Sequence, residues 1–191
     1  MTFDSASSLP GICVFCGSSQ GEDPAYAQAA RTFGALIAIN GFRLVFGGGR
    51  IGLMGETATG TAYQEGAILG IIPDFLRHVE LPLRAASKIV VTETLSERKA
   101  KMFEAAMGFA VLPGGIGTYD EFFEAISEGQ LGRHEKPIVL INIKNYFVPL
   151  IALLEHSIEH GFANPSVKDL FQVVETPEEA IKIFAAKLAS T

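Results

Sequence analysis

A glycine-rich stretch at residues 112–121 contains the residue types best suited to holding a phosphate. It follows a short apolar run at residues 109–112 and precedes a helical pattern, so the glycines form a strand-to-helix turn. Glycines let the backbone approach a ligand closely, and the start of a helix offers free N–H groups and a positive dipole end. A hydroxyl adds one more donor. The groups expected to line the site belong to Gly114, Gly115, Ile116, Gly117 and Thr118.

Glu121 lies one helical turn beyond the glycines. Its carboxylate would repel a phosphate, so it has another purpose. A phosphate site with a carboxylate just beyond it indicates a phosphorylated sugar, with the acid directed at the sugar.

Charged residues crowd a second helix start, where residues 97–101 read Glu-Arg-Lys-Ala-Lys. Cations at the N-terminal end of a helix oppose its dipole. Either this helix presents a solvated charged face, or it offers Arg98 and Lys99 to an anionic ligand; helix chemistry alone leaves both open. Ser96 is the expected N-cap, and Lys99 three residues later excludes a capping box.

The elements that must position these residues alternate along the chain. Apolar runs predict strands at residues 11–15, 43–46, 67–72, 88–91, 109–112, 137–141 and 171–174. Helical patterns lie at residues 24–39, 54–66, 95–107, 122–131, 146–159 and 177–189, the first with Asp23 as its N-cap and Pro24 at its first position. We expect an α/β fold: a Rossmann-like, doubly wound, mostly parallel sheet of about seven strands with helices on both faces. Residues 1–10 are expected to be a flexible N-terminus and 11–191 a single domain.

Ligands of such sheets bind beyond the carboxyl ends of the strands. Four loops leave strand ends with polar or glycine chemistry, and right-handed crossovers would bring them to one edge. Besides the two helix starts above, they carry Gly17, Ser18, Gly48 and Gly49.

Composition narrows the partners. The chain of 191 residues has a net charge of −6, which argues against duplex nucleic acid or an anionic membrane surface as the main partner. The first ten residues lack a charged n-region and an apolar h-region, and no uncharged apolar run approaches the ~20 residues of a membrane span. A cytoplasmic protein is expected.

Two spacings resemble metal or redox motifs. Cys13 and Cys16 form C-x-x-C, but Cys13 falls inside a predicted strand, so structural thiols are favoured. His156 and His160 are four residues apart, as helical zinc ligands would be, yet no third ligand is apparent and a surface helix is favoured. No metal site is predicted.

A third motif is the G-x-G-x-x-G of Gly47, Gly49 and Gly52, with Asp74 about 20 residues further on. This is formally a dinucleotide fingerprint, and it makes an NAD(P)-dependent oxidoreductase a less favoured alternative. The fingerprint normally occupies the first strand–helix unit, and here it occupies the second. A second loop lining the phosphate site, or a tight turn, are the other interpretations.

Taken together, Glu97-Arg98-Lys99 and the stretch Pro113-Gly114-Gly115-Ile116-Gly117-Thr118 with Glu121 resemble the paired signature of the LOG (Lonely Guy) family. These are cytokinin riboside 5′-monophosphate phosphoribohydrolases, once widely labelled lysine decarboxylases. The resemblance covers about residues 11–175 and includes Gly17-Ser18 and Met54.

The resemblance implies a homodimer that hydrolyses the N-glycosidic bond between an N6-modified adenine and ribose 5-phosphate, without a metal or organic cofactor. It implies that Arg98 and Glu121 are catalytic and that Lys99, the glycine turn, Glu80 and Ser127 contact the nucleotide. Ser127 stands where the family usually has Thr, and Leu95-Ser96, Met107-Gly108 and Glu128 also depart from its pattern. A nucleotide or molybdenum-cofactor carrier on the same scaffold is the alternative; keeping both Arg98 and Glu121 speaks against it.

Overall fold

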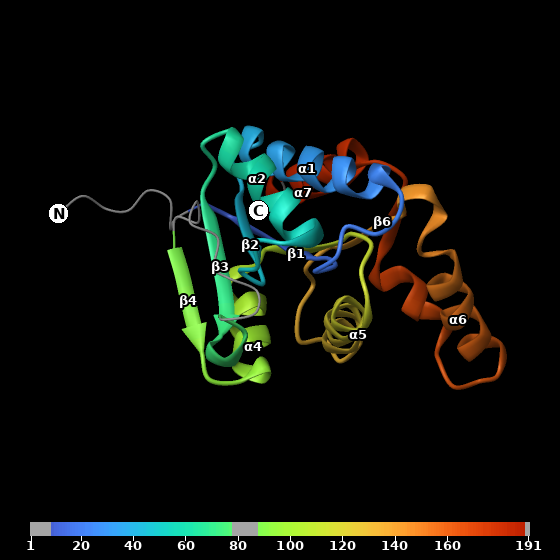
Figure 1. The fold of residues 1–191 in the computed structure, drawn as a ribbon. Coiled ribbons are helices and arrows are strands. Elements are labelled where there is room, and N and C mark those ends of the chain that lie inside the picture. The colour runs from blue at the N-terminus through green and yellow to red at the C-terminus, as the bar shows by residue number, and fades with distance from the viewer. Residues whose placement is uncertain (1–8, 78–87, 190–191) are drawn as a thin grey trace.

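Seven strands form one sheet in a computed structural model of the chain, which describes residues 9–77 and 88–189 (Figure 1). The order is β4-β3-β2-β1-β5-β6-β7, and all six pairings between neighbours are parallel. The doubly wound α/β fold expected from the sequence is confirmed. The strands are β1 (Gly11–Phe15), β2 (Arg43–Phe46), β3 (Ile68–Pro73), β4 (Lys88–Thr92), β5 (Gly108–Val111), β6 (Ile138–Ile141) and β7 (Gln172–Val174).

Helices cover both faces of the sheet (Figure 1). One face carries α1 (Pro24–Ile39), α2 (Gly52–Tyr63) and α7 (Pro177–Ala189), and the other carries α4 (Leu95–Ala105), α5 (Ile116–Gln130) and α6 (Val148–Glu159). Alternate residues of β1 point into two separate cores, with Ile12 and Val14 on the first face and Cys13 and Phe15 on the second. Short 3-10 turns are η2 (Asp74–Leu76), η3 (Ile143–Asn145) and η4 (Pro165–Leu170).

The predicted strands match the observed ones to within one residue at each end. The first helix is capped as expected, because the Asp23 carboxylate accepts a hydrogen bond from the Ala25 N–H at 2.9 Å. The predicted cap of α4 was wrong. Thr94, not Ser96, caps this helix and accepts from the Glu97 N–H, while the Glu97 carboxylate accepts from the Glu93 N–H. A capping arrangement like the one that was excluded for Ser96 and Lys99 is therefore present between Thr94 and Glu97, except that Glu97 binds the N–H of the residue before the cap.

Two helices are shorter than predicted. α4 ends at Ala105 because the chain then turns extended, and the Met107 N–H donates to the Gly11 carbonyl at 2.7 Å to begin the pairing of β5 with β1. α6 begins only at Val148. Tyr146 still closes the preceding 3-10 turn by donating to the Ile143 carbonyl, and Phe147, whose N–H donates to Asn142 Oδ1 at 2.7 Å, is the N-cap.

The strand order reverses direction between β1 and β5. From β1 the chain winds outward through β2, β3 and β4, and it then crosses back to β5 and continues to β7 on the other side. The loops that leave β1 and β5 therefore diverge, which opens a crevice at their carboxyl ends. No helix in the described part of the chain is long and apolar enough to cross a membrane.

Candidate active site

Two cavities lie at this crevice, one on each side of the glycine turn. The first, of about 290 Å³, lies between the β1 loop and the turn, with Tyr26 and Tyr146 in its wall. The second, of about 280 Å³, contains both Arg98 and Glu121. The two cavities share Gly17, Ser18 and Gly115. A ligand with its phosphate at the glycine turn would therefore reach the second cavity directly.

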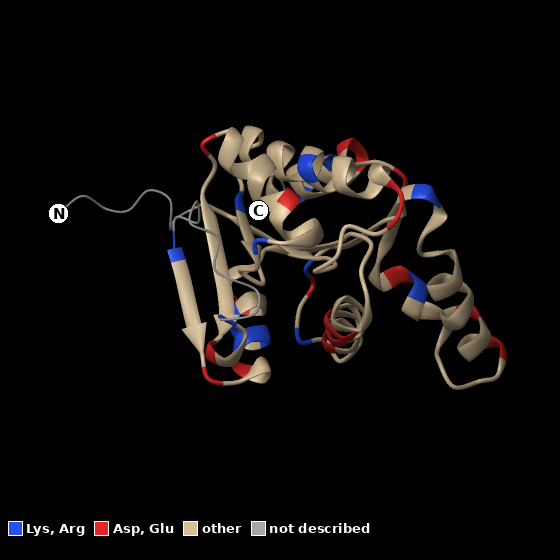
Figure 2. Ribbon diagram, viewed as in Figure 1, with Lys and Arg blue, Asp and Glu red and all other residues tan. Residues whose placement is uncertain are grey.

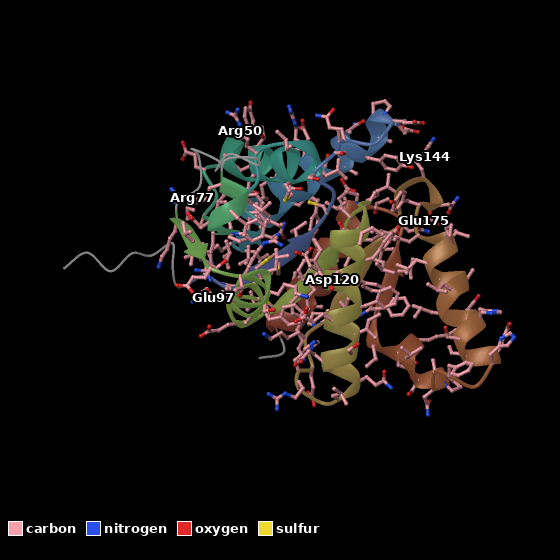
Figure 3. All side chains as sticks on the ribbon, turned by 60° about the horizontal axis from the view of Figure 1, so that its bottom comes forward. Arg50, Arg77, Glu97, Asp120, Lys144 and Glu175 are labelled. Carbon is pink, nitrogen blue, oxygen red and sulfur yellow. The ribbon has the colours of Figure 1, made fainter. Side chains whose placement is uncertain are left out.

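Arg98 and Glu121 form an ion pair in the wall of the second cavity. The distance from Arg98 Nη1 to Glu121 Oε1 is 3.1 Å, and the two side chains are 14% and 8% exposed. The pair joins the start of α4 to the first turns of α5, two helices that Figure 3 shows side by side with Glu97 and Asp120 labelled on them. Residues 23 positions apart in sequence thus meet in one site.

The fold holds the Arg98 guanidinium on two further sides. Its Nε donates to the Ile71 carbonyl of β3 at 3.2 Å. Its Nη2 lies against the bare backbone of Gly47, where any side chain would collide with it. A glycine at the end of β2 therefore makes the room that this arginine occupies.

Glu121 is a buried carboxyl with an unusual proton affinity. Burial raises its pKa to about 7, although the Arg98 charge beside it acts to lower the pKa. The neighbouring Asp120 carboxylate adds to the increase. Near neutral pH, Glu121 is therefore poised between its acid and base forms, as a general base requires.

The glycine turn presents an uncapped helix start to the cavities. Gly115 is the N-cap of α5, and no side chain accepts a hydrogen bond from the helix start there. Thr118 is buried, and its hydroxyl packs so close to Gly114 that a side chain at 114 would collide with it. On the far side, the Tyr146 hydroxyl donates to the Gly114 carbonyl at 2.5 Å. The turn is thus fixed while its N–H groups stay available to an anion.

The loop after β1 and the start of α2 are joined through backbone hydrogen bonds. The Gly17 carbonyl accepts from the N–H groups of Leu53 and Met54, at 3.0 and 3.3 Å. Gly52 adopts φ +61, and a side chain there would collide with the Ser18 backbone. These contacts place Met54 in the wall of the second cavity, as expected from the sequence.

Lys99 is placed differently from its neighbour Arg98. Its ammonium contacts Asp120 Oδ2 at 2.9 Å and Glu124 Oε2 at 2.5 Å, and it is not among the residues lining either cavity. Although burial acts to lower it, the pKa of Lys99 is raised by the hydrogen bonds that its ammonium donates to these two carboxylates. Figure 2 shows the blue residues of α4 and the red residues of α5 on adjacent helices. At the charged start of α4, therefore, Arg98 faces the cavity and Lys99 does not.

Other predicted contact residues lie outside the cavities. Ser127 is exposed on α5, nearly two turns beyond Glu121. Gly48 and Gly49 are buried, and Gly48 packs against Ile72 of β3 rather than facing a ligand. Glu80 lies outside the described residues.

Sequence reasoning missed several residues that shape the site. They are scattered in the sequence and carry no chemical signature of their own: Tyr26, Gly47, Leu76 and Tyr146. Gly47 belongs to one of the four loops expected at the carboxyl edge and to the dinucleotide fingerprint, but its contact with Arg98 was not predicted. In the structure it packs on Arg98, and Asp74, the acid of that fingerprint, is exposed and paired with Arg77 at 3.1 Å.

Both cysteines are free and buried, and burial raises the pKa of each thiol. A thiol in such surroundings is rarely ionised, so it is a poor nucleophile and a poor metal ligand. The arrangement agrees with structural thiols.

The fold and the site define a class of protein. Its members are doubly wound α/β proteins with a glycine-rich turn at a helix start and a buried Arg–Glu ion pair, both at the place where the strand order reverses. Residues 54–184 match the model of a family described as "Possible lysine decarboxylase". A protein of Rhodococcoides fascians named cytokinin riboside 5′-monophosphate phosphoribohydrolase is 38% identical over 171 residues, which cover 89% of this chain and 86% of the relative. A rice protein (Oryza sativa subsp. japonica) named probable cytokinin riboside 5′-monophosphate phosphoribohydrolase LOGL2 is 35% identical over 171 residues, covering 90% and 70%. The chain belongs to the LOG family.

Solved structures share the fold. The molybdenum cofactor binding protein from Rippkaea orientalis superposes with a TM-score of 0.73 at 22% identity, covering 94% of this chain and 98% of that one. At this identity the likeness concerns the fold alone.

Proposed function

We propose that this chain hydrolyses the N-glycosidic bond of adenosine 5′-monophosphates, including N6-modified ones, and releases the free base and ribose 5-phosphate. The observation that carries the proposal is the buried Arg98–Glu121 pair in a cavity that the uncapped start of α5 also lines. Family membership and the activities named for the relatives support it.

Glu121 is the residue proposed to act on the sugar. Cleavage of a ribosyl bond builds positive charge on the sugar ring, which a nearby carboxylate stabilises. The same carboxylate can take a proton from the attacking water. A carboxyl with a pKa of about 7 is matched to proton transfer at neutral pH.

Arg98 is proposed to relieve the negative charge that develops on the departing base, or to hold the phosphate. Its guanidinium is fixed by Ile71 and Glu121, so little reorganisation is needed during the reaction. Glu121 also keeps this partly buried cation from being an unpaired charge.

The 5′-phosphate is proposed to bind the N–H groups of the glycine turn, with Ser18 and the Thr118 hydroxyl beside it. It is remote from the reacting bond, so its binding energy serves to position the sugar. For Lys99 we propose an indirect part: by holding Asp120 and Glu124 it keeps α4 against α5, and so keeps Arg98 near Glu121.

Apolar side chains at the rim of the second cavity suit a base with an apolar substituent. Leu76, Leu95 and Ile116 line it, and Ile116 is 84% exposed. We also propose a homodimer, as the family resemblance implies, in which this apolar rim faces the second copy. The free cysteines are in keeping with a reducing, cytoplasmic compartment.

The test is incubation of the purified protein with AMP and, separately, with isopentenyladenosine 5′-monophosphate, followed by chromatography of base and ribose 5-phosphate. Release of both products in equal amounts from either nucleotide supports the proposal, and the ratio of rates gives the preferred base. Tight binding without release would overturn it in favour of a carrier. Light scattering of the same sample measures the oligomeric state.

A further inference from the structure

The C-terminal end of α6 gathers three side chains that can ligate a metal ion. His156, Glu159 and His160 are all exposed, and each offers one ligand atom such that the three atoms lie within 4.8 Å of one another. Residues 156–160 read His-Ser-Ile-Glu-His, an H-x-x-E-H pattern whose glutamate was overlooked when no third ligand was found beside the two histidines. The helix supplies it: residues three and four positions apart share one face.

The two imidazoles are held close together. Their ring centroids are 4.0 Å apart, with an interplanar angle of 44°. His160 Nδ1 lies 2.9 Å from the His156 carbonyl oxygen. Because a carbonyl can only accept a hydrogen bond, Nδ1 is the donor and the neutral ring carries its lone pair on Nε2. A backbone contact of this kind fixes the tautomer of a metal-binding histidine.

The electrostatic surroundings favour a cation. His160 is the C-cap of α6, so the site lies at the negative end of the helix dipole. Lys168, which contacts this helix, pairs with Glu155 at 2.8 Å and not with Glu159. Within the described residues, no lysine or arginine forms an ion pair with Glu159.

We propose that His156, Glu159 and His160 form a surface site for a divalent transition metal such as Zn²⁺, with water in the remaining coordination positions. Two imidazoles and one carboxylate select zinc, cobalt, nickel or copper over magnesium and calcium, which prefer oxygen ligands. The site is separate from the candidate active site, because α5 lies between α4 and α6 (Figure 1). It does not depend on the proposed hydrolysis.

Isothermal titration of untagged protein with Zn²⁺, repeated in excess Mg²⁺, tests the proposal. We expect one saturable zinc site per chain that Mg²⁺ does not displace. His156→Ala and His160→Ala should each weaken zinc binding at least tenfold, and Glu159→Gln should weaken it less. Glu155→Gln, on the same helix one turn earlier, removes a negative charge outside the cluster and should leave binding unchanged.

Absorption spectroscopy with Co²⁺ gives a second measurement that does not depend on the heat of binding. Replacing zinc by Co²⁺ should give a visible absorption band that is lost in His156→Ala and His160→Ala. All four positions are exposed, so the variants should keep the circular dichroism spectrum of the parent. Absence of saturable zinc binding, or equal binding by the parent and both histidine variants, would overturn the site.

Discussion

Arg98 Nη1 lies 3.1 Å from Glu121 Oε1, and both side chains are largely withdrawn from solvent. Each residue therefore provides much of the charge compensation for the other. The carboxyl nevertheless keeps a pKa of about 7, because burial outweighs the arginine. A pair of this kind is stable enough to be held in place, yet its carboxyl can still exchange a proton near neutral pH.

Glu121→Gln should abolish base release while nucleotide binding survives. The amide keeps the shape of the side chain but can neither accept the proton of water nor balance a positive sugar ring. We expect kcat to fall at least ~100-fold, the lower range for loss of a general base. Glu104→Gln, at an exposed glutamate of α4 outside both cavities, is the matched control. An equal loss of affinity and turnover in Glu121→Gln would remove its specific part in the transition state.

Arg98→Ala should cut turnover by several orders of magnitude, and Arg98→Lys should restore only a small part. A lysine cannot both donate to the Ile71 carbonyl and reach Glu121 in the geometry of the guanidinium fork. The measurement is kcat for AMP in the three proteins, with the near-ultraviolet circular dichroism spectrum as a check on folding. Near-parental rates in Arg98→Ala would show that the arginine takes no part.

The rate of base release should rise with pH through about 7 in kcat/KM, because the free protein needs Glu121 ionised to act as a base. The charge of Arg98 acts to lower the pKa of Glu121, so Arg98→Ala should move the midpoint of the profile to higher pH. Arg98→Lys keeps a cation and should shift the midpoint less. A pH–rate profile in each protein checks this. A rising limb centred near 4.5, the ordinary value of a glutamate, would contradict the assignment.

The free energy of unfolding should also depend on the ionisation of Glu121, but it should fall as pH rises, whereas the rate of base release should increase. The folded pKa of Glu121 is raised from 4.5 to about 7, so its favourable contribution is full below pH 4.5 and is lost as pH rises through 7. The loss is on the order of 3 kcal/mol, at about 1.4 kcal/mol for each pH unit between the two values. Urea unfolding at pH 5 and pH 8 should therefore show that Glu121→Gln, which cannot ionise, loses less stability over this range than the parent.

Lys99→Met should lower kcat for AMP more than it raises KM, because we propose that Lys99 positions Arg98 without touching the nucleotide. Its removal leaves Asp120 and Glu124 unpaired beside each other and frees α4 from α5. The double variant Asp120→Asn/Glu124→Gln should have the same kinetic effect, and Lys99→Arg should recover most of it. A large increase in KM for Lys99→Met alone would mean that the lysine binds the nucleotide directly.

The sequence predicted the strands and their order of appearance better than it predicted helix ends and the positions of individual side chains. Apolar runs located the seven strands of the described sheet. The five inner strands are largely buried and therefore continuous in hydrophobicity, whereas the edge strands β4 and β7 are partly exposed and were found from shorter apolar runs. The cap of α4 was misplaced because Thr94 and Ser96 are both good caps and only the register decides between them. The glycine turn and the Arg98 helix start were expected at one edge of the sheet because of right-handed crossovers, but no local pattern gives the ion pair between Arg98 and Glu121.

Long-range contacts explain the remaining differences. Lys99 was grouped with Arg98 because they are adjacent in sequence, but successive helix positions point about 100° apart and reach different neighbours. Gly47 was expected in a loop at the carboxyl edge of the sheet, but nothing in its own segment reveals that an arginine 51 positions later fills the space beside it.

Gly47→Ala is the sharpest test of how the site is built. Gly47 has an ordinary backbone conformation, so alanine adds no strain to the chain, but its methyl group would occupy the place of Arg98 Nη2 and press on the Met54 sulfur. The guanidinium must then move away from Glu121. Because misplacement of a catalytic group by about 1 Å can cost ~100-fold in rate, we expect a loss of that size in kcat. Gly129→Ala, within α5 and with only ordinary contacts to His134, should leave the rate unchanged and stabilise the helix slightly. If Gly47→Ala turned over AMP as fast as Gly129→Ala, the position of Arg98 would not govern the reaction.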